Sequence, residues 1–244
     1  MAAVLTPDRP VPQRWHRRHA ALVRITHWIN AFCFTLLLMS GLQIFNAHPA
    51  LYVGQASDFS HPILSIRGFP SWITVPSYRD LATGRRWHFF FAWALVLNGL
   101  VYLGCGFANR HFGRDLFPHR VELRHIGGEV LDHLRLRFPR GEAAKRYNVL
   151  QQLTYLLVVF GLFPLMVLTG LTMSPGIDSA VPQLLTLFGG RQTARLIHFA
   201  CASALVLFVI VHLVLVLVSG VWNNLRSMIT GWYDLGNARR THVP

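Results

Sequence analysis

The last apolar stretch of the chain, from Ala194 to Gly220, is the feature that most constrains the fold. It reads ARLIHFACASALVLFVIVHLVLVLVSG, which is long enough to cross a bilayer as a helix. It contains His198 and His212, 14 residues apart. On a helix this spacing puts both imidazoles on nearly one face, about 21 Å apart along the axis. Because ionisable side chains are costly in hydrocarbon, two histidines on one face indicate a function.

Three further stretches have a similar length and apolar character. The chain is 52% hydrophobic and 14% charged, a composition typical of helical membrane proteins. We predict an all-α integral membrane protein, a bundle of four transmembrane helices in which Pro164 kinks the third. No internal repeat is apparent. The expected spans are residues 22–45, 87–107, 149–173 and 194–221, inside a domain of residues 20–233 that lies between an N-terminal segment, 1–19, and a tail, 234–244.

The basic residues orient this bundle. Of 23 lysines and arginines, 17 lie in the stretch up to Arg24, in the connection from Arg110 to Arg146 and after Val221. The positive-inside rule therefore predicts that both termini are cytoplasmic. The net charge of +13 follows from this topology, and we expect no nucleic-acid partner. Residues 123–138 have a helical apolar period, which favours an amphipathic helix on the inner leaflet over an ordinary basic loop.

Four of the thirteen histidines fall inside the expected spans. With both termini inside, His27 and His212 are at the inner level, and His88 and His198 are at the outer level. Two level-matched pairs on facing helices suit the axial ligation of iron in two haems b. No C-x-x-C-H motif is present, so the haems would be bound non-covalently.

Other readings of these histidines exist. A single intramembrane histidine is more often a packing or polar-pathway residue, and His88 alone could be interfacial. A zinc site shared by both pairs is disfavoured by their separation. The pairing by depth favours two haems. With two imidazole ligands each, their irons have no open position for a substrate and are suited to electron transfer. The residues suggest no acid–base catalyst.

Arginine precedes three of the four histidines by three residues: Arg24, Arg85 and Arg195. Each would lie one turn nearer the membrane surface, where guanidinium groups can bind haem propionates. Ordinary snorkelling at helix ends explains the pattern equally well. Small residues such as Gly41 and Gly170 allow either a porphyrin or another helix to approach closely. Asn148, at the inner start of span three, could bind a quinone carbonyl, although a helix N-cap is the simpler explanation.

Several segments together resemble a known family. They are RITHWINA, RRWHFFFAW, RYN-x-x-Q, LTGLTMSPG and RLIHF with a second histidine 14 residues on. They are similar to the prokaryotic dihaem cytochrome b subunits of nickel–iron hydrogenases, formate dehydrogenases and thiosulfate reductase-like molybdoenzymes. The resemblance implies a bacterial inner-membrane protein with axial pairs His27–His212 and His88–His198. It also implies a quinone site beside the inner haem, matching Tyr147, Asn148 and Gln151, although Leu150 replaces a family glycine.

We therefore expect a membrane subunit that transfers electrons between a periplasmic redox partner and the quinone pool. The resemblance indicates a molybdopterin oxidoreductase or a hydrogenase-type subunit as that partner. The partner would dock on the outer connections, residues 46–86 and 174–191. One alternative is a stand-alone membrane cytochrome b oxidoreductase that acts on superoxide or quinol. A second is a haem-free anchor or channel, which an absorption spectrum would distinguish.

Overall fold

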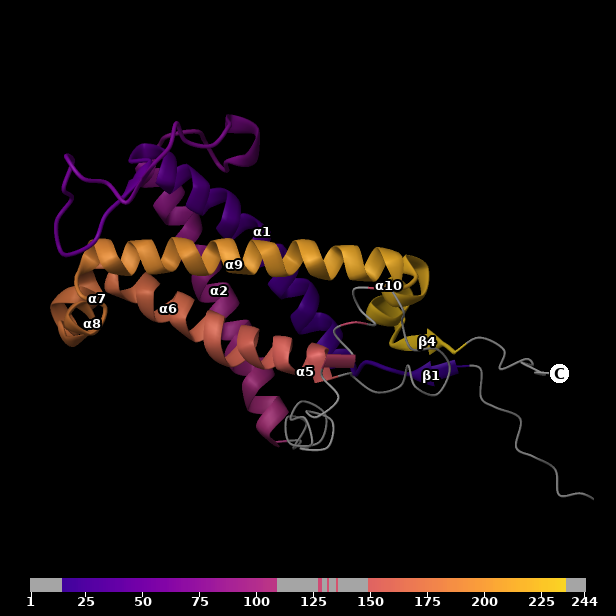
Figure 1. Ribbon diagram of the computed structural model, residues 1–244. Helices are drawn as coiled ribbons and strands as arrows, with labels where there is room; N and C mark the ends of the chain where they lie inside the picture. Colours follow the sequence, from indigo (N-terminus) through magenta and orange to yellow (C-terminus); the bar gives the residue numbers. More distant parts are fainter. Residues whose placement is uncertain (1–14, 109–126, 129–130, 132–134, 136–148, 236–244) are drawn as a thin grey trace, which may run out of the picture.

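The computed structural model describes residues 15–108, 127–128, 131, 135 and 149–235 (Figure 1). Asn148 and most of the expected amphipathic segment 123–138 lie outside these residues. Among the described residues, four helical stretches are long and apolar enough to cross a membrane, the number that the sequence predicted. They are α1 (Ala21–Ala47), α2 (Leu81–Ala108), the composite third span and α9 (Arg191–Val218).

Helix α2 begins six residues before its predicted start at residue 87, and Asp80 explains the difference. The Asp80 carboxylate accepts hydrogen bonds from the backbone amides of Ala82, at 2.9 Å, and Thr83, at 3.2 Å. A side-chain acceptor at this place satisfies the unpaired amides of a first helical turn. Hydropathy detects only the apolar part of a span, and therefore missed this polar first turn.

The third span is interrupted close to Pro164, as expected. It consists of α5 (Val149–Leu156), the π-helical segment η4 (Leu157–Leu162) and α6 (Phe163–Thr172). Proline has no amide hydrogen and its ring crowds the preceding turn, so the regular ladder of hydrogen bonds cannot continue through it. The helix widens into a π-helical turn that ends two residues before the proline.

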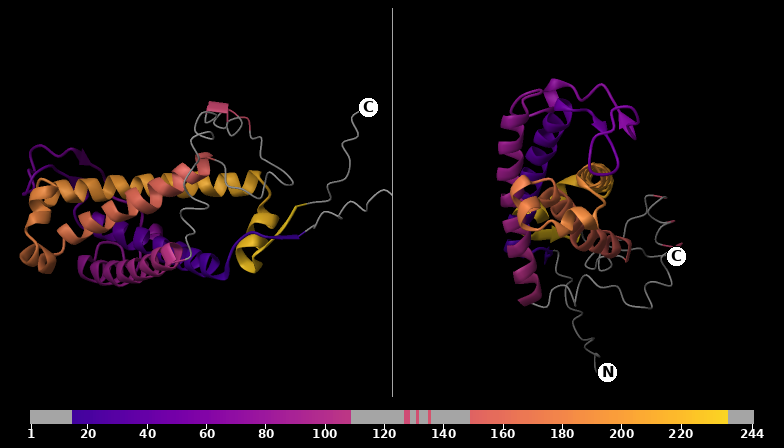
Figure 2. Two further views of the ribbon diagram at one scale, coloured as in Figure 1. Left: turned by 90° about the horizontal axis from the view of Figure 1, so that it is seen from below. Right: turned by 90° about the vertical axis from the view of Figure 1, so that its left-hand side faces the viewer.

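The helices form two hairpins, α1 with α2 and α6 with α9, which lie against each other (Figures 1 and 2). Polar side chains join α1 to α2. The Gln43 amide donates to the Thr83 hydroxyl at 3.2 Å, and the Asn98 amide donates to the Thr26 carbonyl at 2.9 Å. In a membrane, such contacts and small residues hold helices together, because lipid provides no polar partner.

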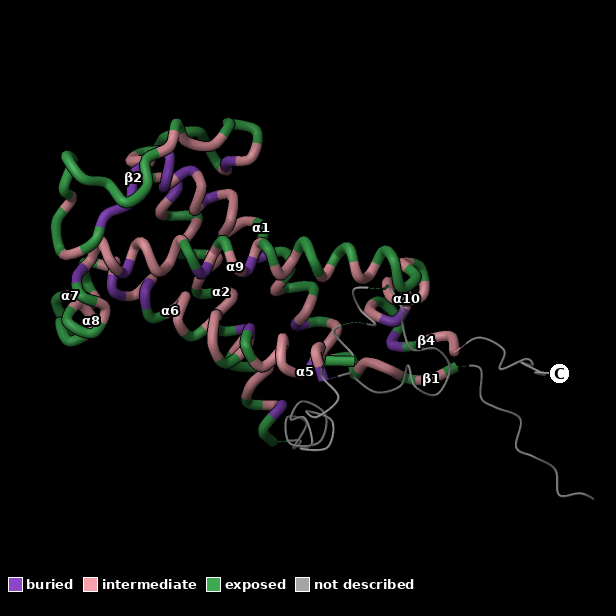
Figure 3. The backbone as a smooth tube through the Cα atoms, in the orientation of Figure 1, coloured by how far each residue is buried: buried purple, intermediate pink, exposed green. Residues whose placement is uncertain are grey.

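Many polar side chains of the helices are buried, and many large apolar ones, such as Leu207, Ile210 and Leu217 of α9, are exposed. Figure 3 colours the backbone by burial. This arrangement suits a bundle whose outer surface faces hydrocarbon.

The connection between α1 and α2 folds over the start of α9. It contains an antiparallel pair of short strands, β2 (Ala50–Leu51) and β3 (Leu64–Ser65), and the 3-10 turn η1 (Ser71–Ile73). Gly54 donates its amide hydrogen to the Thr193 hydroxyl at 2.8 Å. Gly190 has φ +107°, and a Cβ there would lie 2.5 Å from the Gly54 carbonyl oxygen, so only glycine permits this approach. Two short helices, α7 (Pro175–Ala180) and α8 (Gln183–Leu187), complete this end.

The opposite end contains a feature that the sequence did not reveal. Helix α9 ends at Val218, three residues before the expected end of span four at residue 221, and Gly220, with φ +111°, leads into α10 (Val221–Thr230). Strands β1 (Trp15–Arg17) and β4 (Trp232–Asp234) then pair antiparallel. Residues 15–17 of the N-terminal segment are thus paired with residues 232–234, which follow α10. Pairing between strands so remote in sequence leaves no local pattern.

Candidate functional site

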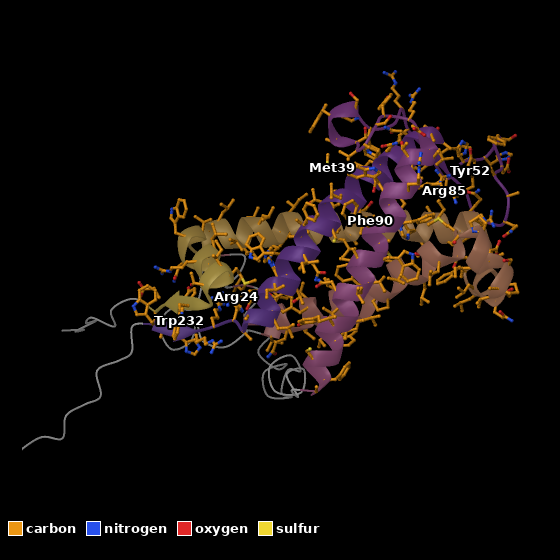
Figure 4. The ribbon with its side chains drawn as sticks, turned by 180° about the vertical axis from the view of Figure 1, so that it is seen from behind. Arg24, Met39, Tyr52, Arg85, Phe90 and Trp232 are labelled. Carbon is orange, nitrogen blue, oxygen red and sulfur yellow. The ribbon has the colours of Figure 1, made fainter. Side chains whose placement is uncertain are left out.

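The structure brings the four intramembrane histidines together in two pairs. At the end covered by the β2–β3 connection, His88 of α2 faces His198 of α9, with ring centres 6.2 Å apart and an angle of 62° between the rings. We call this the outer pair. Figure 4 labels Arg85 and Tyr52 at this end of the bundle.

The second pair lies towards the end that carries α10 and the β1–β4 sheet. His27 of α1 faces His212 of α9, with ring centres 6.3 Å apart and an angle of 55° between the rings. We call this the inner pair. Phe208 stacks on His212 at 6.0 Å, and Trp28 meets the His27 ring edge-on at 5.3 Å. Helix α9 therefore contributes one histidine to each pair.

The spacing within each pair can be compared with the needs of a haem iron. Two imidazoles bound at about 2.0 Å, with each ring centre about 1.1 Å behind its nitrogen, would require ring centres roughly 6.2 Å apart. The observed 6.2 Å and 6.3 Å fit that requirement. Among the described residues, no group of three or more His, Cys, Asp or Glu side chains could hold a metal ion by itself. Each pair thus offers two protein ligands, the number that a porphyrin iron needs.

The outer histidines are each held by the first helix of their own hairpin. His88 Nδ1 lies 3.1 Å from the Leu37 carbonyl oxygen and 3.1 Å from the Ser40 hydroxyl. His198 Nδ1 lies at the same two distances from the Met166 carbonyl oxygen and from the Thr169 hydroxyl.

A glycine follows each of these hydroxyl residues. A Cβ on Gly41 would be 3.3 Å from His88 Cε1, and a Cβ on Gly170 would be 3.3 Å from His198 Cε1. Both distances are tighter than an ordinary carbon–carbon contact, so each glycine provides the space in which the imidazole rests. The expectation that Gly41 and Gly170 allow close approach is thus met by a histidine ring of the neighbouring helix.

These two supports are an internal repeat that the sequence analysis missed. Residues 37–42 read LLMSGL and residues 166–171 read MVLTGL, and each segment cradles a histidine of the following span. The repeat is short, and leucine-rich segments are common in membrane helices. Only the matching contacts to His88 and His198 give it meaning. Sequence reasoning therefore identified the ligand candidates but not the Ser40 and Thr169 hydroxyls behind them.

Two of the three predicted propionate-binding arginines, Arg24 and Arg85, lie at opposite ends of the bundle (Figure 4). At the end with Trp232, Arg24 donates through Nη1 to the Ile229 carbonyl of α10. At the other end, the Arg85 guanidinium lies 5.5 Å from the centre of the Phe89 ring. Arg195 donates to the carbonyls of Ala50, at 2.9 Å, and His48, at 2.5 Å, which ties α9 to the outer connection.

Comparison with known proteins gives the family. The family model described as prokaryotic cytochrome b561 matches residues 18–231. A putative protein-methionine-sulfoxide reductase subunit YedZ1 of Azospira oryzae is 32% identical over 198 residues, 81% of this chain and 89% of the relative. A probable Ni/Fe-hydrogenase B-type cytochrome subunit of Bradyrhizobium diazoefficiens is 29% identical over 224 residues, 87% of this chain and 82% of the relative. No solved structure matches the chain. This chain belongs to the prokaryotic cytochrome b561 family of membrane b-type cytochromes.

Proposed function

We propose that the chain is a dihaem cytochrome b subunit that passes electrons between an extracytoplasmic redox partner and the membrane quinone pool. The observation that carries the proposal is the pair of facing histidine couples, with ring centres 6.2 Å and 6.3 Å apart. His88 and His198 would hold the outer haem, and His27 and His212 the inner one. Haem b supplies a one-electron ferric–ferrous couple.

The residues favour electron transfer over chemistry on a bound substrate. Two histidine side chains would hold each haem, and a haem held in this way would supply electron exchange and not chemistry on a bound substrate. His198 and His212 are separated by 14 residues of one helix, so the two sites would be about 21 Å apart along α9. Two redox sites at different depths provide a path across the bilayer.

The arginine distribution supports the orientation that we propose. The outer pair lies at the end with few basic residues in the sequence, and the inner pair at the end where both chain termini enter the bundle. In a bacterial inner membrane, the positive-inside rule would put the termini in the cytoplasm. Quinone would then react near the inner pair, with Asn148 as a contact by its family resemblance.

Arg24, Arg85 and Arg195 complete the proposed sites as cations for haem propionates. Arg195 also fastens the outer connection, so it would serve both roles. Replacing Arg195 by glutamine removes a positive charge beside the outer haem, and should lower that haem's midpoint potential. An unchanged potential would exclude the propionate contact of Arg195.

The partner is proposed from two observations. One relative is named as a methionine-sulfoxide reductase subunit and another as a hydrogenase cytochrome subunit. Both names imply a separate catalytic subunit, and we propose a periplasmic redox protein of molybdopterin oxidoreductase or hydrogenase type. It would dock over the outer connections, where Phe59 and Trp72 are 76% and 79% exposed.

Purification in mild detergent tests the function. We expect b-type absorption bands, two haems per chain and two midpoint potentials in a potentiometric titration. Quinol should reduce the inner haem, and copurification should retain the redox partner. Protein that folds normally in haem-supplied cells but shows no b-type bands would overturn the proposal.

A further inference from the structure

The Ser40 and Thr169 hydroxyls are in equivalent positions behind the two outer histidines. Each lies 3.1 Å from the Nδ1 of its histidine. Both residues are fully buried, and each comes from the helix adjacent to the one that carries the histidine. Such a hydroxyl could be an ordinary helix-bonded residue or a functional contact, and its hydrogen bonds distinguish the two.

The hydroxyl protons are already used within each helix. Ser40 donates to the Leu36 carbonyl at 2.6 Å, and Thr169 donates to the Leu165 carbonyl at 2.7 Å. A hydroxyl has one proton and two lone pairs, so each oxygen can only accept from the nearby ring. The carbonyls of Leu37 and Met166 are acceptors as well. Both imidazoles must therefore carry their hydrogen on Nδ1, which leaves Nε2 unprotonated and able to bind a metal.

Other hydroxyls show that the bond within the helix does not by itself require a histidine. Thr172, one turn beyond Thr169 and equally buried, donates to the Leu168 carbonyl at 2.8 Å, and the described contacts include none between Thr172 and a histidine. Thr35 of α1 likewise donates to Ala31 at 2.9 Å. The contact to Nδ1 is thus an additional property of Ser40 and Thr169.

The inner pair differs in this respect. The Nδ1 atom of His27 is buried and has no hydrogen-bond partner among the described residues. His212 contacts the aromatic ring of Phe208. Within the part of the chain that the structure describes, a double acceptor at Nδ1 is thus found behind the outer histidines and not behind His27.

We infer that Ser40 and Thr169 are positioning residues of the outer haem site, which fix the tautomer of His88 and His198 and lower the outer haem's potential. The inference rests on the proposed function. A hydrogen bond from Nδ1 to an acceptor increases electron donation by the imidazole, and this stabilises ferric over ferrous iron. Each outer histidine has two such acceptors, and all four would lower the potential of the outer haem.

The test is a potentiometric titration of the purified full-length chain carrying Thr169→Val or Ser40→Ala. Thr169→Val keeps the shape of the side chain and removes the acceptor; Thr172→Val and Thr35→Val are the matched controls. The outer haem is the titrating component that is absent from His88→Ala. We expect Thr169→Val and Ser40→Ala each to raise the midpoint potential of the outer haem by up to about 59 mV, a tenfold change in the ferrous-to-ferric ratio.

The midpoint potential of the inner haem should stay constant in all these variants. Thr169→Ser and Ser40→Thr keep the hydroxyl, so the outer haem should have the same potential as in the unmodified chain. Equal outer potentials in Thr169→Val and Thr172→Val, with both haems bound, would overturn the inference and leave the proposed function intact. If Ser40→Ala fails to assemble, Thr169→Val provides the same comparison. Absence of haem from the unmodified chain would overturn the proposed function instead.

Discussion

Ser40 and Thr169 lie 129 positions apart in sequence, yet their hydroxyl oxygens stand at the same distance, 3.1 Å, from the Nδ1 atoms of His88 and His198. The first helix of each hairpin thus supports a histidine of the second helix. This relationship makes the outer pair the more constrained of the two. It also gives the two proposed haems different surroundings, from which several outcomes follow.

Removing one histidine should remove one haem. His212→Ala would remove one of the two histidines proposed to hold the inner haem, whereas the outer pair keeps its ring separation of 6.2 Å. We expect about one haem per chain and the loss of one component in the potentiometric titration. His198→Ala should eliminate the other component. Retention of both haems in His212→Ala would contradict the pairing, and replacing the exposed His61 is a suitable control.

The two haems of the unmodified chain should differ in potential, with the outer one lower. Nδ1 of each outer histidine has two acceptors, whereas Nδ1 of His27 has no partner among the described residues. Stronger electron donation stabilises ferric iron at the outer site. Electron transfer from the outer to the inner haem would then be the energetically downhill direction. Titration of the single-haem variants measures the order directly, and a lower inner potential would refute it.

Adding a methyl group at Gly41 or Gly170 should weaken the outer site. An alanine Cβ there would be 3.3 Å from the Cε1 atom of His88 or His198, so the ring or its helix must move. We expect a cost of about 1–3 kcal/mol, seen as lower haem occupancy and a shifted outer potential. Gly99→Ala is the control, because nothing lies within 4 Å of its added carbon. Equal haem binding by Gly41→Ala and Gly99→Ala would show that the close contact of Gly41 with His88 is not needed for haem binding.

Arg195 should stabilise the outer connection. Its guanidinium donates to the carbonyls of Ala50 and His48 at once, and lysine does not reproduce this forked geometry. Arg195→Lys keeps the charge but should cost about 1–3 kcal/mol locally. Faster proteolysis between residues 50 and 65 would report the loss, with exposed Arg67→Gln as control. Unchanged cleavage rates would show that the connection is held by its other contacts.

His19 should make the protein sensitive to acid. Burial, with added repulsion from Arg18, His27 and Arg24, lowers the pKa of His19 from 6.5 to about 4. Between these values the unfolded chain binds a proton at His19 that the folded chain does not, so the free energy of unfolding falls as pH decreases. The loss is at most about 3 kcal/mol by pH 4. His19→Gln should flatten the pH dependence of thermal stability over this window, and an unchanged pH dependence would contradict this role of His19.

The sequence by itself determined the class of the fold. Four apolar stretches of sufficient length, and the histidines at two depths, follow from hydropathy and helical spacing, which are local properties. The proline at position 164 predicted a kink in the third span, where the structure has a π-helical segment. These local properties could not give the polar first turn of α2, because hydropathy does not record the capping carboxylate of Asp80.

Only the tertiary structure shows which groups accept hydrogen bonds from the two outer histidines, His88 and His198. The six-residue segments around Ser40 and Thr169 look like ordinary membrane helix, and their role depends on how α1 packs on α2 and α6 on α9. The β1–β4 sheet and the hold of Arg195 on the outer connection likewise join segments remote in sequence. Spacing along one helix is fixed by its backbone, whereas the partner that a side chain meets is fixed by the packing of separate helices.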